Sequence, residues 1–101
     1  MHQVYSRTFY NSKSWRNVKF SLYGGADNKF ILSVHSSRSV GNVECSNVVK
    51  WHWLGIIRSC KSARLFRKDN VEIHTSNGSL CLHIKSNILN CFQKSIFISK
   101  T

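Results

Sequence analysis

Residues 72–86, EIHTSNGSLCLHIKS, carry the pattern that decides the fold, because apolar and polar side chains alternate on both sides of a turn signal. The dipeptide Asn77-Gly78 is a strong short-range signal for a two-residue type I′ turn. We therefore expect a β-hairpin with its turn at 77–78, with one apolar and one polar face. The apolar face consists of Val71, Ile73, Thr75, Leu80, Leu82 and Ile84, and the polar face of Glu72, His74, Cys81, His83 and Lys85.

The polar face of this hairpin carries residue types that bind zinc. With the turn at 77–78, His74 lies opposite Cys81 and Glu72 lies opposite His83, with Cβ atoms ~4.5–5.5 Å apart in each pair. However, neighbouring side chains on a flat sheet diverge, and this spacing matches no standard zinc motif. We therefore expect a half-exposed polar face with cross-strand pairs and no cofactor. A zinc site formed by Glu72, His74, Cys81 and His83 is the alternative.

Enzymatic chemistry has little support in the sequence. A nucleophile pair of Cys81 and His74 on opposed strands lacks an evident oxyanion pocket. The chain also contains no glycine-rich phosphate loop, no His-Glu-x-x-His and no Gly-x-Ser-x-Gly motif. We therefore expect a protein without enzymatic activity and without a small-molecule substrate.

Upstream of the hairpin, the alternating stretches 17–23 and 29–35 predict two further strands, joined by a turn at 24–28. We expect a loop at 36–42, an extended segment at 43–49 and a last strand at 95–99. The fold class is then mainly β with a minor α component (α+β), a small antiparallel sheet or barrel of five to six strands with one short basic helix. The length of 101 residues suits a single domain, 1–101, in which residues 1–16 are either a basic N-terminal arm or another strand.

The short basic helix is expected at 55–68. Basic residues recur there every three or four positions, and a second set, Ile57, Cys60 and Ala63, recurs on the opposite side. Such a stripe presents a row of cations at spacings of ~5–6 Å, on the scale of the phosphates of a nucleic-acid strand. The cations are Arg58, Lys61, Arg64, Arg67 and Lys68.

The charge of the chain points to an anionic partner. Lys and Arg number 15 against 4 Asp and Glu, which gives a formal net charge of +11. Nucleic acid, anionic lipid and acidic proteins all fit such an excess. No stretch approaches the ~18 apolar residues of a membrane span. We therefore expect nucleic acid as the main partner, with a protein partner as a further candidate.

Two tryptophans, Trp51 and Trp53, precede the expected helix. Aromatic side chains beside a basic stripe can stack on unpaired bases. The alternatives are a solvated charged face and tryptophans that belong to the core. The sequence thus favours a small, basic, non-enzymatic protein that binds nucleic acid, RNA above all, through its backbone. A viral accessory protein or a ribonucleoprotein-associated protein would fit this description.

Four cysteines, Cys45, Cys60, Cys81 and Cys91, are too widely spaced for a Cys-x-x-Cys motif. Asn77-Gly78-Ser79 matches a glycosylation acceptor. A secreted or host-directed, disulfide-stabilised protein-interaction module is therefore the alternative function. Because no apolar signal segment opens the chain, we expect reduced cysteines and an intracellular location, whether cytoplasmic, nuclear or organellar.

Overall fold

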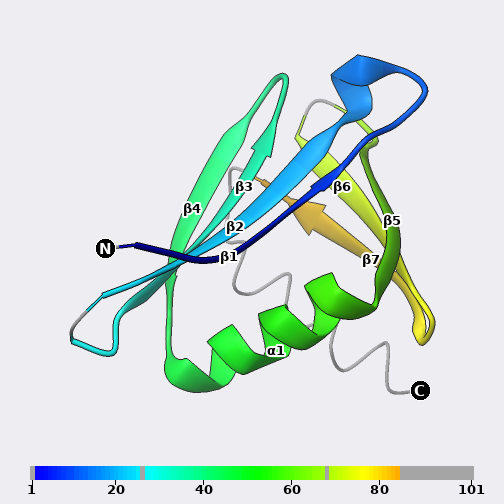
Figure 1. Cartoon of the computed structure of the whole chain (residues 1–101). Coiled ribbons are helices and arrows are strands. Elements are labelled where there is room, and N and C mark those ends of the chain that lie inside the picture. The colour runs from blue at the N-terminus through cyan, green and yellow to red at the C-terminus, as the bar shows by residue number, and fades with distance from the viewer. Residues whose placement is uncertain (1, 26, 68, 85–101) are drawn as a thin grey trace.

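The chain folds into two antiparallel sheets connected by one helix, as Figure 1 shows for the computed structural model. The structure describes residues 2–25, 27–67 and 69–84. Its elements are β1 (His2–Phe9), the 3₁₀ helix η1 (Ser14–Arg16), β2 (Val18–Gly24), β3 (Phe30–Ser36), β4 (Val40–Cys45), α1 (Asn47–Ser59), β5 (Cys60–Leu65), β6 (Asn70–Thr75) and β7 (Gly78–His83). The expectation of a mainly β protein with one helix is confirmed, with seven strands in the described residues. The strand expected at 95–99 lies outside them.

The first sheet has the order β1-β2-β3-β4. Its central hairpin, β2–β3, lies where the alternation predicts it, and Phe20 and Leu22 of β2 face Val34 and Leu32 of β3. These four side chains are buried, because they lie on the face of the sheet that packs against the rest of the molecule. Residues 2–9, expected as an arm or a strand, form β1 along the edge of β2. The expected loop at 36–42 is shorter than predicted, since β4 begins at Val40.

The helix expected at 55–68 is wrong in position. Helix α1 begins where the Ser46 hydroxyl accepts a hydrogen bond from the Val49 amide (3.3 Å), as an N-terminal cap does. It ends at Ser59, and the next residues form β5. The extended segment expected at 43–49 therefore covers only the end of β4. Helix α1 buries Trp53, Leu54 and Ile57, of which Trp53 and Ile57 have the four-residue spacing of one helical face.

The apolar spacing that suggested a helix beyond residue 59 has another origin. Ile57, Cys60 and Ala63 are all buried, three residues apart, but Ile57 belongs to α1 and the other two belong to β5. The pairing of β5 with β6 shifts register between Cys60 and Ser62, so an extra residue separates two inward side chains. A strand irregularity next to a helix end therefore produced a three-residue spacing that resembles a helix.

The second sheet, with the order β5-β6-β7, contains the hairpin predicted from residues 72–86. Its two faces are as predicted, because Val71, Ile73, Leu80 and Leu82 are all buried. The predicted register is wrong, however: the turn lies at 76–77, so Thr75 is paired with Gly78, Glu72 with Cys81 and His74 with Ser79. A shift of two residues exchanges the partners but keeps every side chain on its face.

The hairpin turn is set by local hydrogen bonds. The Thr75 hydroxyl donates to the Gly78 carbonyl (3.0 Å) and accepts from the Asn77 amide (3.2 Å). Gly78 has a φ of +131°, a value that L side chains rarely adopt, whereas neither Ser76 nor Asn77 has a positive φ. Since a type I′ turn needs positive φ at both central residues, the predicted turn type does not form.

One hydrophobic core joins both sheets and the helix. Trp53 of α1 is completely buried, with its ring centroid 6.0 Å from that of Phe20, which in turn packs edge-on against Phe9 at 5.9 Å. The two sheets are also joined by Asn11, whose side-chain amide donates to the Ala63 carbonyl of β5 at 3.0 Å. Among the described residues, no helix combines the length and apolarity required to cross a bilayer.

Candidate nucleic-acid interface

Few of the described cations are neutralised by a carboxylate. Arg64 forms an ion pair with Glu72, with Nη2 3.4 Å from Oε1, and the other carboxylate contacts in this part of the chain involve His74 and His83. The remaining Lys and Arg side chains within the described ranges have no carboxylate within 4.0 Å. Their charge therefore remains available to an external anion.

Many of these cations are instead held against aromatic rings, at 4.0 to 5.5 Å from the ring centroids. The contacts are Arg7 over Phe9, Arg16 and Arg38 over Trp15, Lys50 over Phe30 and Trp51, Arg58 over Tyr5, and Arg67 over Phe66. A ring orients a guanidinium or ammonium group without satisfying its N–H donors. Apart from Arg7, which donates to the carbonyls of Ile57 and Arg58, these cations are oriented by rings rather than by carboxylates.

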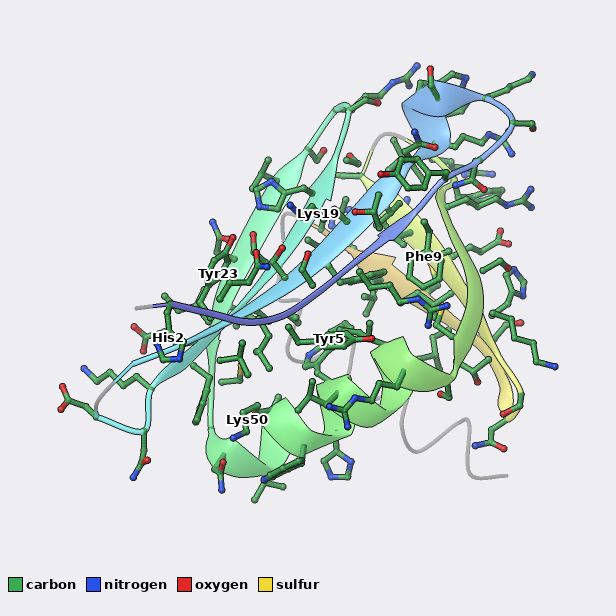
Figure 2. The ribbon with its side chains drawn as sticks, in the orientation of Figure 1. His2, Tyr5, Phe9, Lys19, Tyr23 and Lys50 are labelled. Carbon is green, nitrogen blue, oxygen red and sulfur yellow. The ribbon has the colours of Figure 1, made fainter. Side chains whose placement is uncertain are left out.

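The solvent face of α1 combines an exposed aromatic ring with two of these cations. Trp51 is 59% exposed, and the Lys50 ammonium lies 4.7 Å from its ring centroid. Trp51, Gly55 and Arg58 share one stripe of the helix because they are four and three residues apart. In Figure 2, Lys50 lies on the N-terminal part of α1 and Tyr5 lies between α1 and β1.

A surface pocket of about 340 Å³ opens beside Trp51, between α1 and the β6–β7 hairpin. Its lining includes Trp51, Gly55 and Ile56 from α1, and Thr75, Asn77 and Leu80 from the hairpin. Leu80 is buried and Ile56 is half-buried, whereas Asn77 is exposed at the turn. The pocket therefore has an apolar floor, one aromatic wall and a polar rim.

At the C-terminal end of α1, a cation from β1 joins Arg58. The Arg7 guanidinium, which extends from β1, donates to the carbonyls of Ile57 (2.7 Å) and Arg58 (3.3 Å). A cation at this end is favoured by the partial negative charge of the terminal carbonyls. The Arg58 guanidinium lies 5.5 Å from the Tyr5 ring centroid, so β1 and α1 together gather Arg7, Arg58 and Tyr5.

A separate group lies at the end of the first sheet away from α1, around η1 and the β3–β4 turn (Figure 1). Arg16 and Arg38 contact the same ring, at 4.8 and 4.7 Å from the centroid of Trp15. The Ser37 hydroxyl donates to the Trp15 carbonyl at 2.7 Å and ties the turn to η1. This group makes the cationic surface of the protein larger than the α1 face alone.

The cations predicted from the sequence do not form a stripe on one helix. Arg58 lies on α1, whereas Lys61 and Arg64 lie on β5, and Arg67 lies in the turn that follows. Lys61 and Arg67 are exposed, Arg64 is paired with Glu72, and Lys68 lies outside the described residues.

The two predicted tryptophans have opposite environments. Trp51 is exposed on α1, whereas Trp53 is completely buried and belongs to the core. Four further cations lie on aromatic rings: Arg7, Arg16, Arg38 and Lys50. Sequence reasoning placed Arg7 and Arg16 only in a basic N-terminal arm and missed Arg38 and Lys50. Three of the four have a sequence signal, because each contacts a ring one or two positions away, whereas Arg38 reaches Trp15 only through the fold.

The polar face of the β6–β7 hairpin is occupied by internal hydrogen bonds. The His74 ring contacts Glu72 Oε1 through Nε2 and the Ser79 hydroxyl through Nδ1, each at 2.9 Å. The hydrogen bond with His74 lowers the pKa of Glu72, and the charge of Arg64 contributes in the same direction.

The His83 ring lies with Nε2 3.3 Å from Asp69 Oδ1. No group of three or more His, Cys, Asp or Glu side chains in the described part of the chain is arranged to hold a metal ion. The zinc alternative therefore gains no support from the hairpin.

Cys45 and Cys60 are free thiols, and both are buried. Burial raises the pKa values of Cys45 and Cys60, so both stay protonated and unreactive at neutral pH. Cys81 is exposed on the outer face of β7. Cys91 lies outside the described residues.

No family model, no curated protein and no solved structure matches this chain.

Proposed function

We propose that the protein binds nucleic acid without catalysing a reaction, and that its natural partner is single-stranded RNA in a ribonucleoprotein or viral setting. The observation that carries this proposal is the exposed Trp51, with Lys50 at its ring and Arg58 on the same helical stripe. Phosphates would contact the cations, and an unpaired base would stack on the indole.

The cations of α1 and β1 suit this role because binding displaces no existing ion pair. Lys50, Arg58 and Arg7 contact rings and backbone carbonyls rather than carboxylates. A polyanion can therefore contact these cations without breaking an ion pair, whereas Arg64 would first have to separate from Glu72. The net charge of +11 adds a long-range attraction that accelerates encounter.

Salt dependence tests the electrostatic part of the proposal. With about four phosphates neutralised by Arg7, Lys50, Arg58 and Lys61, log K against log salt should fall with a slope of about −3 for a single strand. The measurement is fluorescence anisotropy of a labelled RNA of about 20 nucleotides. The salt concentration is varied from about 50 to about 300 mM, a range that brackets the physiological value. A slope near zero, or no binding at the lowest salt, overturns the proposal.

A matched pair of charge variants locates the interface. Arg58→Gln should weaken binding several-fold and reduce the salt slope by about 0.7, the share of one phosphate contact. Lys19→Gln removes the same charge from the exposed outer face of the first sheet, opposite to α1, and should change neither. Equal effects from the two variants would mean that only net charge matters, and would reject α1 as the interface.

The secreted interaction module is the second candidate, because Asn77 of the glycosylation acceptor is exposed in the hairpin turn. The free, buried thiols of Cys45 and Cys60 fit the intracellular location that we propose with nucleic-acid binding. Thiol titration of the unfolded, unreduced protein distinguishes the two, since four reactive thiols fit the first proposal and none fits the second.

A further inference from the structure

We propose that the pocket beside Trp51 accepts a single unstacked nucleobase, which makes the protein selective for single-stranded over double-stranded nucleic acid. This inference rests on the proposed function, because it names the part of the nucleic acid that the same surface recognises. A base in a duplex is stacked on both faces and cannot enter such a pocket.

Gly55 keeps the pocket open. It lies in the interior of α1, where glycine is the least favourable residue after proline. A Cβ atom at this position would meet nothing within 4 Å, so neither close packing nor a positive φ explains the glycine. What the missing side chain does provide is space next to the Trp51 ring, four residues earlier on the same stripe.

The pocket is large enough to accept one base. Its volume of about 340 Å³ is at the lower end of the ~300–1,000 Å³ typical of small-ligand sites. The indole of Trp51 offers a face for stacking, and the half-buried Ile56 and buried Leu80 offer an apolar floor. A flat aromatic ring system of one base matches these walls better than an extended chain does.

The rim of the pocket offers groups for a base edge. The Asn77 carboxamide has both a donor and an acceptor, the pair that amide side chains use to recognise bases. The Thr75 hydroxyl is held in place by its bonds to Gly78 and Asn77, which fixes the turn that carries this carboxamide. The pocket can therefore discriminate between bases as well as stack them.

Charge identifies the occupant as part of a nucleic acid rather than an apolar peptide. Lys50 contacts the Trp51 ring on one side, and Arg58 follows Trp51 two turns later along the helix. Phosphates on either side of an inserted base would meet these cations. No carboxylate of the described residues pairs with either cation or lines the pocket.

The test compares one RNA strand, alone and annealed to its complement, with the full-length chain and two pocket variants. Trp51→Ala removes the stacking wall, and Gly55→Leu fills the pocket with a side chain that meets no neighbour at its Cβ. Both variants should bind the single strand roughly 5- to 100-fold more weakly, the range for loss of one stacked base. Their affinity for the duplex should change less than about twofold, the level of ordinary measurement differences.

Tyr10→Ala is the matched control, because Tyr10 is the most exposed of the described large apolar side chains, at 81%, and does not line the pocket. Circular dichroism of Gly55→Leu should show a retained helix, since leucine is a better helix former than glycine. Weaker binding by this variant is then attributable to the filled pocket rather than to unfolding.

Each outcome separates the inference from the proposed function. If the wild-type protein binds single strand and duplex equally and neither pocket variant changes this, the pocket inference is overturned while nucleic-acid binding stands. If only Trp51→Ala weakens single-strand binding, the base stacks on an open face and the pocket is not used. If the wild-type protein binds neither nucleic acid at low salt, both proposals fail, and an apolar peptide becomes the occupant to consider.

Discussion

Arg7→Met should destabilise the fold by about 2 kcal/mol, because Arg7 connects β1 to the end of α1. The guanidinium donates to two terminal helix carbonyls, the shorter bond being 2.7 Å, and lies 4.5 Å from the Phe9 ring centroid. Hydrogen bonds to charged groups contribute ~1.5–3 kcal/mol, a cation at a helix C-terminus ~0.3–1, and a cation over a ring ~0.5–1. These contributions overlap, so their full sum is not expected. Because methionine retains part of the aliphatic stem, the loss of stability measures the contribution of the guanidinium group.

Urea unfolding at neutral pH, followed by circular dichroism, measures this effect. In a domain of this size, about 2 kcal/mol corresponds to a fall in Tm of roughly 10 °C. Lys19→Met is the control, because Lys19 is exposed on the outer face of the first sheet. It should remain within about 0.5 kcal/mol of the wild-type protein, as surface substitutions do. If Arg7→Met also remains in that range, Arg7 does not stabilise the end of the helix and our account of the β1–α1 junction is wrong.

Three further predictions test the core, the backbone and a titrating group. Trp53→Ala should cost about 3–5 kcal/mol or prevent folding, whereas Trp51→Ala should stay within about 0.5 kcal/mol of the wild type in thermal unfolding. Gly55→Ala should stabilise the fold by about 0.5–1 kcal/mol, because a Cβ meets nothing there and the φ of Gly55 is not positive. Gly78→Ala should destabilise the fold, because Gly78 has a positive φ although its Cβ would also meet nothing. Equal changes of the free energy of unfolding in urea would contradict this. The lowered pKa of Glu72 means that its stabilising contribution is complete above the ordinary value of 4.5 and is lost as pH falls toward the lowered value. In Glu72→Gln, the free energy of unfolding should therefore fall less on acidification than in the wild-type protein. If its pH dependence is unchanged, the hydrogen bond of Glu72 does not contribute to stability.

The part of the fold that could be predicted was the part with local, redundant signals. In the β2–β3 hairpin and in β6 and β7, the alternation of apolar and polar residues determines which side chains face the core. The hairpin register could not be predicted, because Asn77-Gly78 is compatible with a turn at 77–78 and with a turn at 76–77. The Thr75 side chain, which bonds to both Asn77 and Gly78, selects the turn at 76–77.

The helix was misplaced because a single spacing had two physical origins. In α1, Trp53 and Ile57 are four residues apart on one buried face, but Trp51 and Trp53 also alternate as they would in a strand. Beyond Ser59, the register shift in β5 imitates helical spacing. The deciding features are the cap at Ser46 and the side chain of Arg7 at the other end, and the second of these is a contact between residues 50 positions apart.

The displaced helix moves the candidate interface toward the N-terminus of the chain. Asp69, which precedes β6, and Glu72 of β6 both have ionic partners on the second sheet, and Glu72 pairs with Arg64. A cation that already has a carboxylate partner must lose it before it binds a phosphate, so the predicted row on β5 is the less favourable part of the surface. On α1 and β1 the cations contact rings and carbonyls rather than carboxylates, so no ion pair has to break. The same redistribution places the exposed Trp51, rather than the buried Trp53, beside the available charge, and the proposed preference for an unpaired strand rests on this combination.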